Sequence, residues 1–162
     1  MQDTKYKNGF TLVEVLIAII LVGLAIASLV GANISFTRAN GVGADSSTAE
    51  FLTEQFRELS TLLSVIDPNT GTDYFGAEEM VLADYDDLDD FDGKSFSPPI
   101  NANREALNNF GAFSQQITVE NVNGANFENI VADHGSDFVR VTVRVFLNGK
   151  EISSNSWIRA LY

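Results

Sequence analysis

A long apolar run is the first pattern along the chain. From Val15 to Thr37 the sequence contains no Asp, Glu, Lys or Arg. An uncharged run of this length matches the roughly 20 residues that a helix needs to cross about 30 Å of hydrocarbon. It predicts a membrane-spanning helix over residues 10–36. Glycines at Gly31 and within 40–43 leave open where this helix ends, because glycine weakens a helix without stopping it.

A second pattern, with helical spacing, follows a polar interval. Asp45 and the hydroxyl residues after it are typical of a helix start. Pro68 disfavours helix at the residue before it. We therefore expect a helix over residues 45–66 with one apolar face directed at a sheet. The residues of that face are Phe51, Leu52, Phe56, Leu59, Leu62, Leu63 and Ile66.

From residue 113 the hydrophobic period changes to two, which indicates strands. Residues 113–122 and 138–147 alternate, and Asn-Gly pairs at 123–124 and 148–149 favour tight turns. The region 113–162 therefore predicts an antiparallel sheet of three or four strands packed on the 45–66 helix. One face of it comprises Val139, Val141, Val143 and Val145, and we expect Trp157 and Tyr162 to cap it.

Residues 67–112 lack either period and are rich in turn formers and acids. They predict a variable acidic loop region between the helix and the sheet. With one long N-terminal helix ahead of a small antiparallel sheet, the expected fold class is α+β.

One carboxylate, Glu14, interrupts the apolar block near its start. An ionised side chain near lipid costs a few kcal/mol and indicates a functional site, so Glu14 is expected to have a partner. The alternative is that it only reaches toward the headgroups. Lys5 and Lys7 precede the block, which places this end in the cytoplasm. A secretory signal peptide would instead require a small-residue cleavage site after a shorter apolar core.

These residues resemble the signature of the type IV pilin and pseudopilin family. The matching positions are Lys5, Lys7, Gly9, Phe10, Thr11, Leu12 and Glu14. The resemblance implies that a prepilin peptidase removes the leader, residues 1–9, by cutting after Gly9. It further implies that the new amino group of Phe10 is methylated. Glu14 of one subunit would then meet the N-terminus of a neighbour within a filament core.

The resemblance also implies an architecture and a location. Residues 10–36 would form the transmembrane and filament-core helix, and residues 37–162 an acidic type IV pilin-like head. The subunit would sit in the inner membrane with a cytoplasmic N-terminus and a periplasmic head before entering a filament. Its partners would be the lipid bilayer, the prepilin peptidase, the inner-membrane assembly platform and other pilin or pseudopilin subunits.

Three functions remain open from the sequence. The first is a structural, minor pilin-like subunit of a type IV pilus-type filament, with a major pilin as a variant of it. The second is a minor pseudopilin of a type II secretion system. The third is a Ca²⁺-binding adhesion or ligand-binding module that uses a pilin-type anchor.

The composition excludes several classes of function. The net charge is −12, with 22 acidic against 10 basic residues, so the surface repels phosphate backbones and nucleic-acid binding is not expected. The chain has no cysteine, which excludes disulfides and thiol chemistry and departs from the many pilins that close their C-terminal region with a disulfide.

The acidic stretch 84–93 concentrates charge on one loop. Six aspartates that repel one another suit a Ca²⁺ ion, which takes about six to eight oxygen ligands in irregular loops. The spacing does not match an EF-hand, because Leu88 stands where that motif needs an acid. A solvated acidic loop explains the same residues equally well. The aspartates are Asp84, Asp86, Asp87, Asp89, Asp90 and Asp92.

The segment 86–93 resembles one found in minor pilins of the mannose-sensitive haemagglutinin type, the kind usually labelled D. Its order is acid, acid, Leu88, acid, acid, Phe91, Asp92, Gly93. An apolar and an aromatic residue three apart predict that the loop docks on the head, which a purely solvated run would not need.

No catalytic constellation is evident, so we do not expect an enzyme. His134 is the only histidine, and the sequence offers no cysteine or second histidine to complete a zinc site with it. A loop histidine is the simpler interpretation. Gly41 and Gly43 lack the third glycine and the preceding strand of a dinucleotide-binding motif.

Overall fold

The computed structural model describes residues 9–69, 71 and 75–161. Lys5, Lys7, most of the expected leader and Tyr162 lie outside these residues. The chain divides into two units, Met1–Gly43 and Ala44–Tyr162. The boundary falls within helix α1, Leu12–Leu62, which is helical through Gly31 and residues 40–43.

The helical part of the first unit is apolar and has no buried residue. Its most apolar 18-residue window has a mean hydropathy of 2.9, and α1 is the one helix in the described residues whose length and composition suit a membrane span. Ser28 is the only polar side chain between Val15 and Ala32, and its hydroxyl donates to the Leu24 carbonyl at 2.9 Å. This segment therefore exposes apolar surface with its one hydroxyl already bonded.

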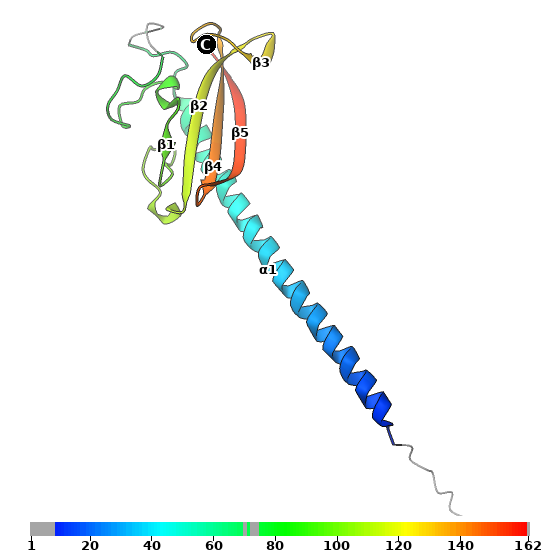
Figure 1. Cartoon of the computed structure of the whole chain (residues 1–162). Helices are drawn as coiled ribbons and strands as arrows, with labels where there is room; N and C mark the ends of the chain where they lie inside the picture. The colour runs from blue at the N-terminus through cyan, green and yellow to red at the C-terminus, as the bar shows by residue number, and fades with distance from the viewer. Residues whose placement is uncertain (1–8, 70, 72–74, 162) are drawn as a thin grey trace, which may run out of the picture. The chain divides into compact units, whose positions relative to one another are not determined.

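The head contains an antiparallel sheet, drawn in Figure 1. Strands β1 (Ser95–Phe96), β2 (Phe113–Asn123), β4 (Phe138–Leu147) and β5 (Lys150–Ala160) lie in the order β1-β2-β4-β5, and β3 (Asn126–Ile130) pairs with β2. All these pairs are antiparallel. One long N-terminal apolar helix with a small antiparallel sheet confirms the expected α+β, type IV pilin-like arrangement.

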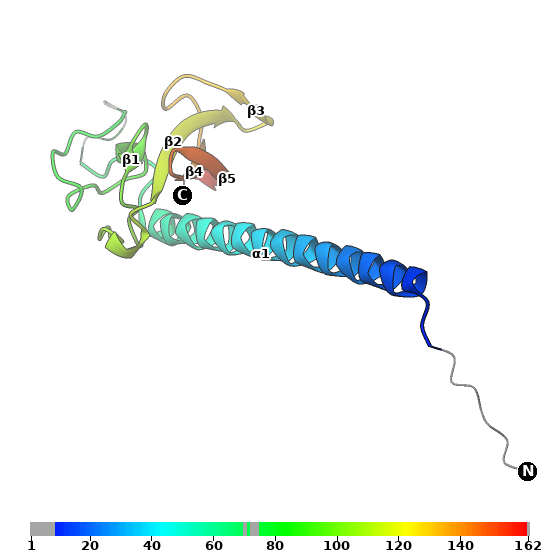
Figure 2. The ribbon, with the colours of Figure 1, turned by 60° about the horizontal axis from the view of Figure 1, so that its bottom comes forward.

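Both expected Asn-Gly turns join strands. Asn148 and Gly149 have φ of 50° and 79°, the left-handed pair that a two-residue hairpin turn requires. Asn123 pairs with Asn126 across the other turn, and β2 curves there into the hairpin with β3 (Figure 2). Strand β1 lies inside the region 67–112, which was expected to be loop, because two residues are too short to show an alternating pattern.

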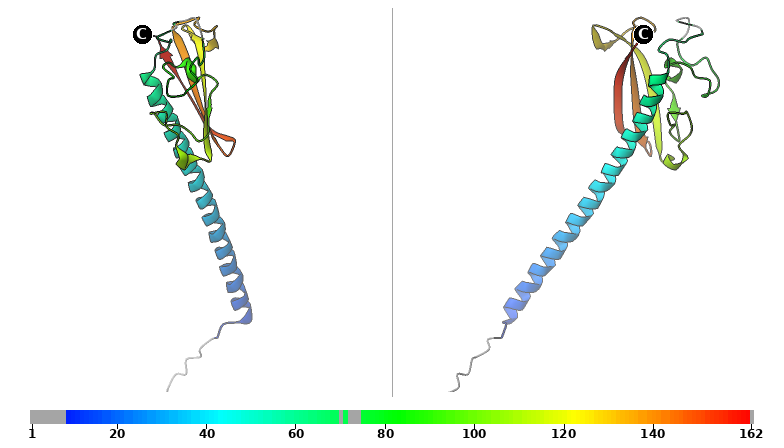
Figure 3. Two further views of the ribbon diagram at one scale, coloured as in Figure 1. Left: turned by 90° about the vertical axis from the view of Figure 1, so that its left-hand side faces the viewer. Right: turned by 180° about the vertical axis from the view of Figure 1, so that it is seen from behind.

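The head part of α1 packs along one face of the sheet (Figure 3). The valine face of β4 is buried, as expected, and meets a stripe of the helix. The expected helix face was too wide, since Phe51 and Leu62 are 45% and 79% exposed. Successive helical residues are about 100° apart, so neighbours of a buried residue turn away from a flat sheet. The stripe consists of Ala49, Leu52, Phe56 and Leu59, continued by Leu63.

The helix ends at Leu62, although residues 45–66 were expected to be helical. Arg159 of β5 donates hydrogen bonds to the carbonyls of Ser60 and Leu63, the latter at 3.3 Å. The Leu88 amide donates to the carbonyl of Ser64 at 3.0 Å. Because partners outside the helix satisfy these carbonyls, the chain leaves the helix well before Pro68.

One buried amide, Gln115, joins the helix, the sheet and the loop region. It is fully buried on β2, and its Nε2 donates to the Leu52 carbonyl at 2.8 Å. Its Oε1 accepts from the amide of Ile100, also at 2.8 Å. A buried polar group of this kind is favourable only while its partners are present.

Replacing Gln115 with Leu should lower the free energy of unfolding of the head by about 1–3 kcal/mol, because the buried Ile100 amide loses its acceptor. The measurement is thermal unfolding of the full chain in detergent, followed by circular dichroism. Gln116→Leu is the matched control, since Gln116 lies on the opposite face of β2. Equal destabilisation by the two variants would contradict the role given to Gln115.

Candidate functional site

The chain ahead of α1 presents the two residues expected to be processed. Gly9 and Phe10 precede the helix and are exposed, Phe10 by 86%. Apart from its chain neighbours, no atom of the described residues lies within 4 Å of the position that a Cβ on Gly9 would take. In the single chain this segment is therefore open to a second protein.

Glu14 lies in the first turn of α1 and closes a capping box with Thr11. The Glu14 amide donates to Thr11 Oγ1 at 3.2 Å. In return, Glu14 Oε2 accepts from the Thr11 amide at 3.1 Å and from the Thr11 hydroxyl at 3.3 Å. Two amides that a helix start leaves without partners are thereby satisfied.

This use of Glu14 was missed in the sequence, although its signature was present. Thr followed three residues later by Glu, directly before an apolar run, is the pattern of a capping box. The sequence interpretation considered Glu14 alone and did not consider that Thr11 could form hydrogen bonds with it. The box occupies only Oε2, and Oε1 accepts no hydrogen bond within the described residues. Glu14 thus has a local role and one oxygen left for another.

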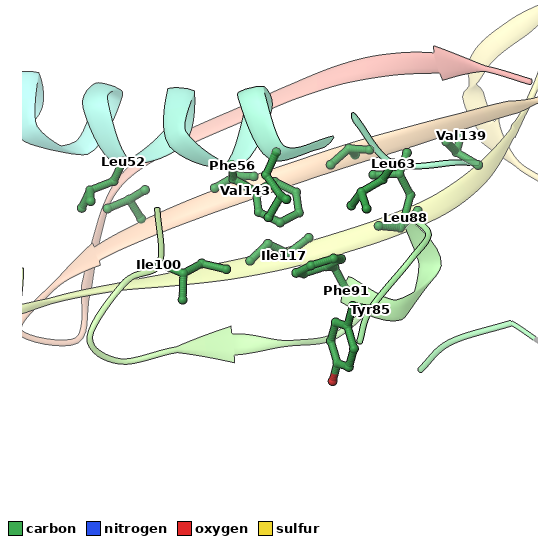
Figure 4. Packing of buried hydrophobic residues seen from close by; sticks show 14 of the residues in the cluster. Leu52, Phe56, Leu63, Tyr85, Leu88, Phe91, Ile100, Ile117, Val139 and Val143 are labelled. Carbon is green, nitrogen blue, oxygen red and sulfur yellow. The ribbon is translucent and has the colours of Figure 1, made fainter. Parts of the chain in front are cut away.

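The acidic loop of the head is anchored by its apolar residues. Leu88 and Phe91 are fully buried and Tyr85 is 8% exposed, and all three belong to the main hydrophobic core (Figure 4). Phe91, in the short 3₁₀ helix η1 (Asp89–Phe91), makes edge-to-face contacts with Phe56 at 5.2 Å and Tyr85 at 5.1 Å between ring centroids. The expected docking of the loop through Leu88 and Phe91 is confirmed.

This anchoring carries acids into the interior. Asp87, Asp89 and Asp90 alternate with the buried apolar residues and are only 1–2% exposed, so they are not a solvated charge run. Asp86 is half-buried beside them. Asp84 is exposed, and Asp92 Oδ1 accepts from the Val119 amide of β2 at 2.8 Å. The structure therefore gathers four of the six aspartates and leaves Asp84 and Asp92 out.

The environment disfavours ionisation of the gathered acids. Burial raises the pKa of Asp87 to about 8, and the neighbouring Asp89 adds to the rise. Burial likewise raises the pKa of Asp86, Asp89 and Asp90 above its ordinary value. The pKa of Glu79 is raised chiefly by the Asp90 side chain, because the two carboxyl groups can hydrogen-bond only when one of them holds a proton. At neutral pH such groups need either protons or a cation among them.

Several residues join this cluster from outside the expected loop motif. Asp67, Glu78 and Glu79 lie close enough to the loop aspartates to share a metal ion with them. His134 Nε2 lies 3.9 Å from Asp89 Oδ2, which places the loop histidine at the edge of the cluster. Sequence spacing carries no signal for these contacts, because the described residues between Asp67 and Glu79 belong to no helix or strand.

Comparison with known families bears on the N-terminal site. Residues 4–30 match the prokaryotic N-terminal methylation motif. This prepilin-type signal supports a type IV pilin-like or pseudopilin subunit. It implies processing by prepilin peptidase and assembly with other pilin subunits, and together with the apolar helix it fits a pilin anchored in the inner membrane.

Comparison of the chain with curated proteins and with solved structures finds no significant match. The methylation motif, residues 4–30, covers part of the expected leader and the first part of α1. The head is therefore interpreted from its own geometry.

Gly9→Val should leave the leader attached, because the resemblance places glycine directly before the cut. Mass spectrometry of the membrane-bound protein should find the wild type beginning at an N-methylated Phe10 and the variant unprocessed. Gly23→Val is the control, since a Cβ meets no atom within 4 Å at either glycine. Normal cleavage of Gly9→Val would show that the cut lies elsewhere.

Proposed function

We propose that this chain is a structural, non-catalytic, minor pilin-like subunit of a type IV pilus-type filament. It is inserted in the inner membrane with its head in the periplasm, cut after Gly9, methylated on Phe10 and assembled through its N-terminal helix. The lipid bilayer surrounds this helix first, and neighbouring subunits surround it after assembly.

The observation that carries the proposal is an exposed apolar helix whose first part lies within a methylation motif. None of the residues in the most apolar window of α1 is buried, although its mean hydropathy is 2.9. An apolar helix with no polar face needs lipid or other apolar helices around it. A filament core made of such helices supplies that cover once the subunit leaves the membrane, and residues 4–30 carry the matching processing signal.

Glu14 gives this assembly its direction. After the cut, the ammonium group of Phe10 in one subunit meets the free Oε1 of Glu14 in its neighbour. Both groups are then out of water, where removing one partner of an ion pair costs about 3–5 kcal/mol. The capping box alone accounts for about 0.5–2 kcal/mol. Docking is therefore the larger of the two roles of Glu14.

The minor rank of the subunit is supported by the head. Segment 86–93 resembles that of the D-type minor pilins of the mannose-sensitive haemagglutinin pilus, and its Leu88 and Phe91 lie in the core. The resemblance thus involves residues that build the head and not only surface charge. It favours a pilus subunit over a secretion pseudopilin.

Glu14→Gln separates docking from helix capping. Glutamine also completes a capping box, so the variant keeps the helix start but loses the negative charge. We expect it to be processed and held in the membrane, and its amount in sheared filaments to fall more than about tenfold. Immunoblots of the membrane and sheared fractions measure both quantities.

Thr11→Val is the matched control for this experiment. It removes the hydroxyl that accepts from the Glu14 amide and leaves the carboxylate in place. Filaments should therefore retain most of this variant. If Glu14→Gln enters filaments normally while Thr11→Val does not, Glu14 serves the cap and the docking role is wrong.

The minor rank is tested by counting subunits. Quantitative mass spectrometry of purified, sheared filaments should find this chain well below the most abundant pilin. An amount equal to that of the main subunit would make it a major pilin. Its absence from surface filaments, together with presence in a periplasmic secretion pseudopilus, would favour the pseudopilin alternative.

A further inference from the structure

The head contains a cluster of carboxylates drawn from three parts of the chain. Asp67 follows α1, Glu78 and Glu79 lie in the middle of the loop region, and residues 86–90 enter η1. They form three overlapping groups of three residues. Within each group, every residue offers one oxygen, and these three oxygens lie within 4.8 Å of one another. The groups are Asp67, Asp86 and Asp87; Glu78, Asp89 and Asp90; and Glu79, Asp86 and Asp90.

Asp90 shows how the backbone prepares these side chains. It is 1% exposed, and its Oδ2 accepts from the amides of Asp86 and Asp87 at 2.9 and 3.3 Å. Its Oδ1 is buried and has no hydrogen-bond partner. One oxygen is thus held by the chain, and the other is presented to the cluster without a partner.

Asp87 and Asp86 likewise have one hydrogen-bonded oxygen and one oxygen without a partner. Asp87 Oδ1 accepts from the amides of Asp89 and Asp90 at 3.0 and 3.1 Å, whereas its Oδ2 is buried and unpartnered. Asp86 Oδ2 accepts from Asn69 Nδ2 at 2.8 Å, and its Oδ1 is unpartnered. Glu79 adds a further buried, unpartnered oxygen, Oε2. The three aspartates are thus held by hydrogen-bond donors before any ion is bound, as the outer partners of a metal site hold its ligands.

Basic side chains do not account for this arrangement, and shared protons account for it only in part. In the part of the chain that the structure describes, no Lys or Arg pairs with Asp86, Asp87 or Asp90. A proton shared between two carboxylates would satisfy two oxygens. Protons shared within the pairs Glu79–Asp90 and Asp87–Asp89 would still leave the buried Oδ1 of Asp86 without a partner. One divalent cation can satisfy several buried oxygens at once.

We propose that Glu79, Asp86 and Asp90 bind a Ca²⁺ ion, with Asp87 beside them. These three residues form one of the groups, and each carries a buried, unpartnered oxygen. An all-carboxylate set on an irregular loop suits Ca²⁺, which accepts variable geometry, better than Mg²⁺, which requires a regular octahedron and keeps its water. The site differs from an EF-hand, since its ligands come from separate parts of the loop.

Calcium would fix the loop region on the head core. Glu79 lies in a stretch without regular structure, whereas Asp86 and Asp90 flank the buried Leu88. A shared ion ties the two stretches together and removes the repulsion among their charges. This inference concerns the head alone and does not depend on assembly of the N-terminal helix.

The test is Ca²⁺ titration of the full chain in detergent after removal of metals with a chelator. Calorimetry should detect binding, and the melting temperature should rise by about 5–10 °C at a hundredfold excess over Kd. Asp90→Asn should lose both effects. Asp84→Asn, which makes the same charge change on an exposed residue of the same loop, should keep both.

Melting in chelator shows whether Asp90→Asn is folded. Asparagine keeps one oxygen to accept from the Asp86 and Asp87 amides and removes one buried charge. The variant should therefore melt at or above the wild-type temperature without Ca²⁺ and below it with Ca²⁺.

Three outcomes would overturn the proposal. The first is no heat and no shift with Ca²⁺ in the wild type. The second is equal loss of binding in Asp84→Asn and Asp90→Asn, which would indicate diffuse attraction to an acidic surface. The third is an equal response to Mg²⁺ at the same concentration, which would remove the assignment to calcium.

Discussion

Packing of one narrow stripe of α1 against the valines of β4 is the interaction on which the head depends. Leu52, Phe56 and Leu59 supply the helix side, and Val141 and Val143 are among the fully buried residues of the sheet. Most of the described residues in the loop region belong to no helix or strand, and Leu88 and Phe91 join this region to the core. The acids between them are buried as a consequence, because their neighbours are.

The two parts of α1 differ in how their apolar residues are distributed around the helix. In the head its apolar residues occupy a stripe, and acids such as Glu54 and Glu58 are exposed. In the N-terminal unit the apolar residues surround the helix, and none of those in its most apolar window is buried within the described part of the chain. A hydrophobic pattern therefore indicates what a segment must contact, even where that contact is another molecule.

Much of this structure follows from patterns that are local in sequence. The strand β4 and the turn at Asn148 and Gly149 are readable because alternation and left-handed turn residues act over a few positions. The end of α1 at Leu62 cannot be predicted from local sequence, since it depends on a hydrogen bond from Arg159, which is distant in the chain. The partners Asp67 and Glu79 were missed for the same reason, as only the folded loop brings them to Asp86.

The bonded hydroxyl of Ser28 limits the polar contacts that this helix can offer to a neighbouring helix. Between Val15 and Ala32 it is the only polar side chain, and it is already committed to its own helix. Against another apolar helix, this length would offer dispersion and side-chain packing, with no free polar group to add a directional contact. A polar contribution to the offset between two such helices would have to come from the groups at the N-terminal end or from the heads.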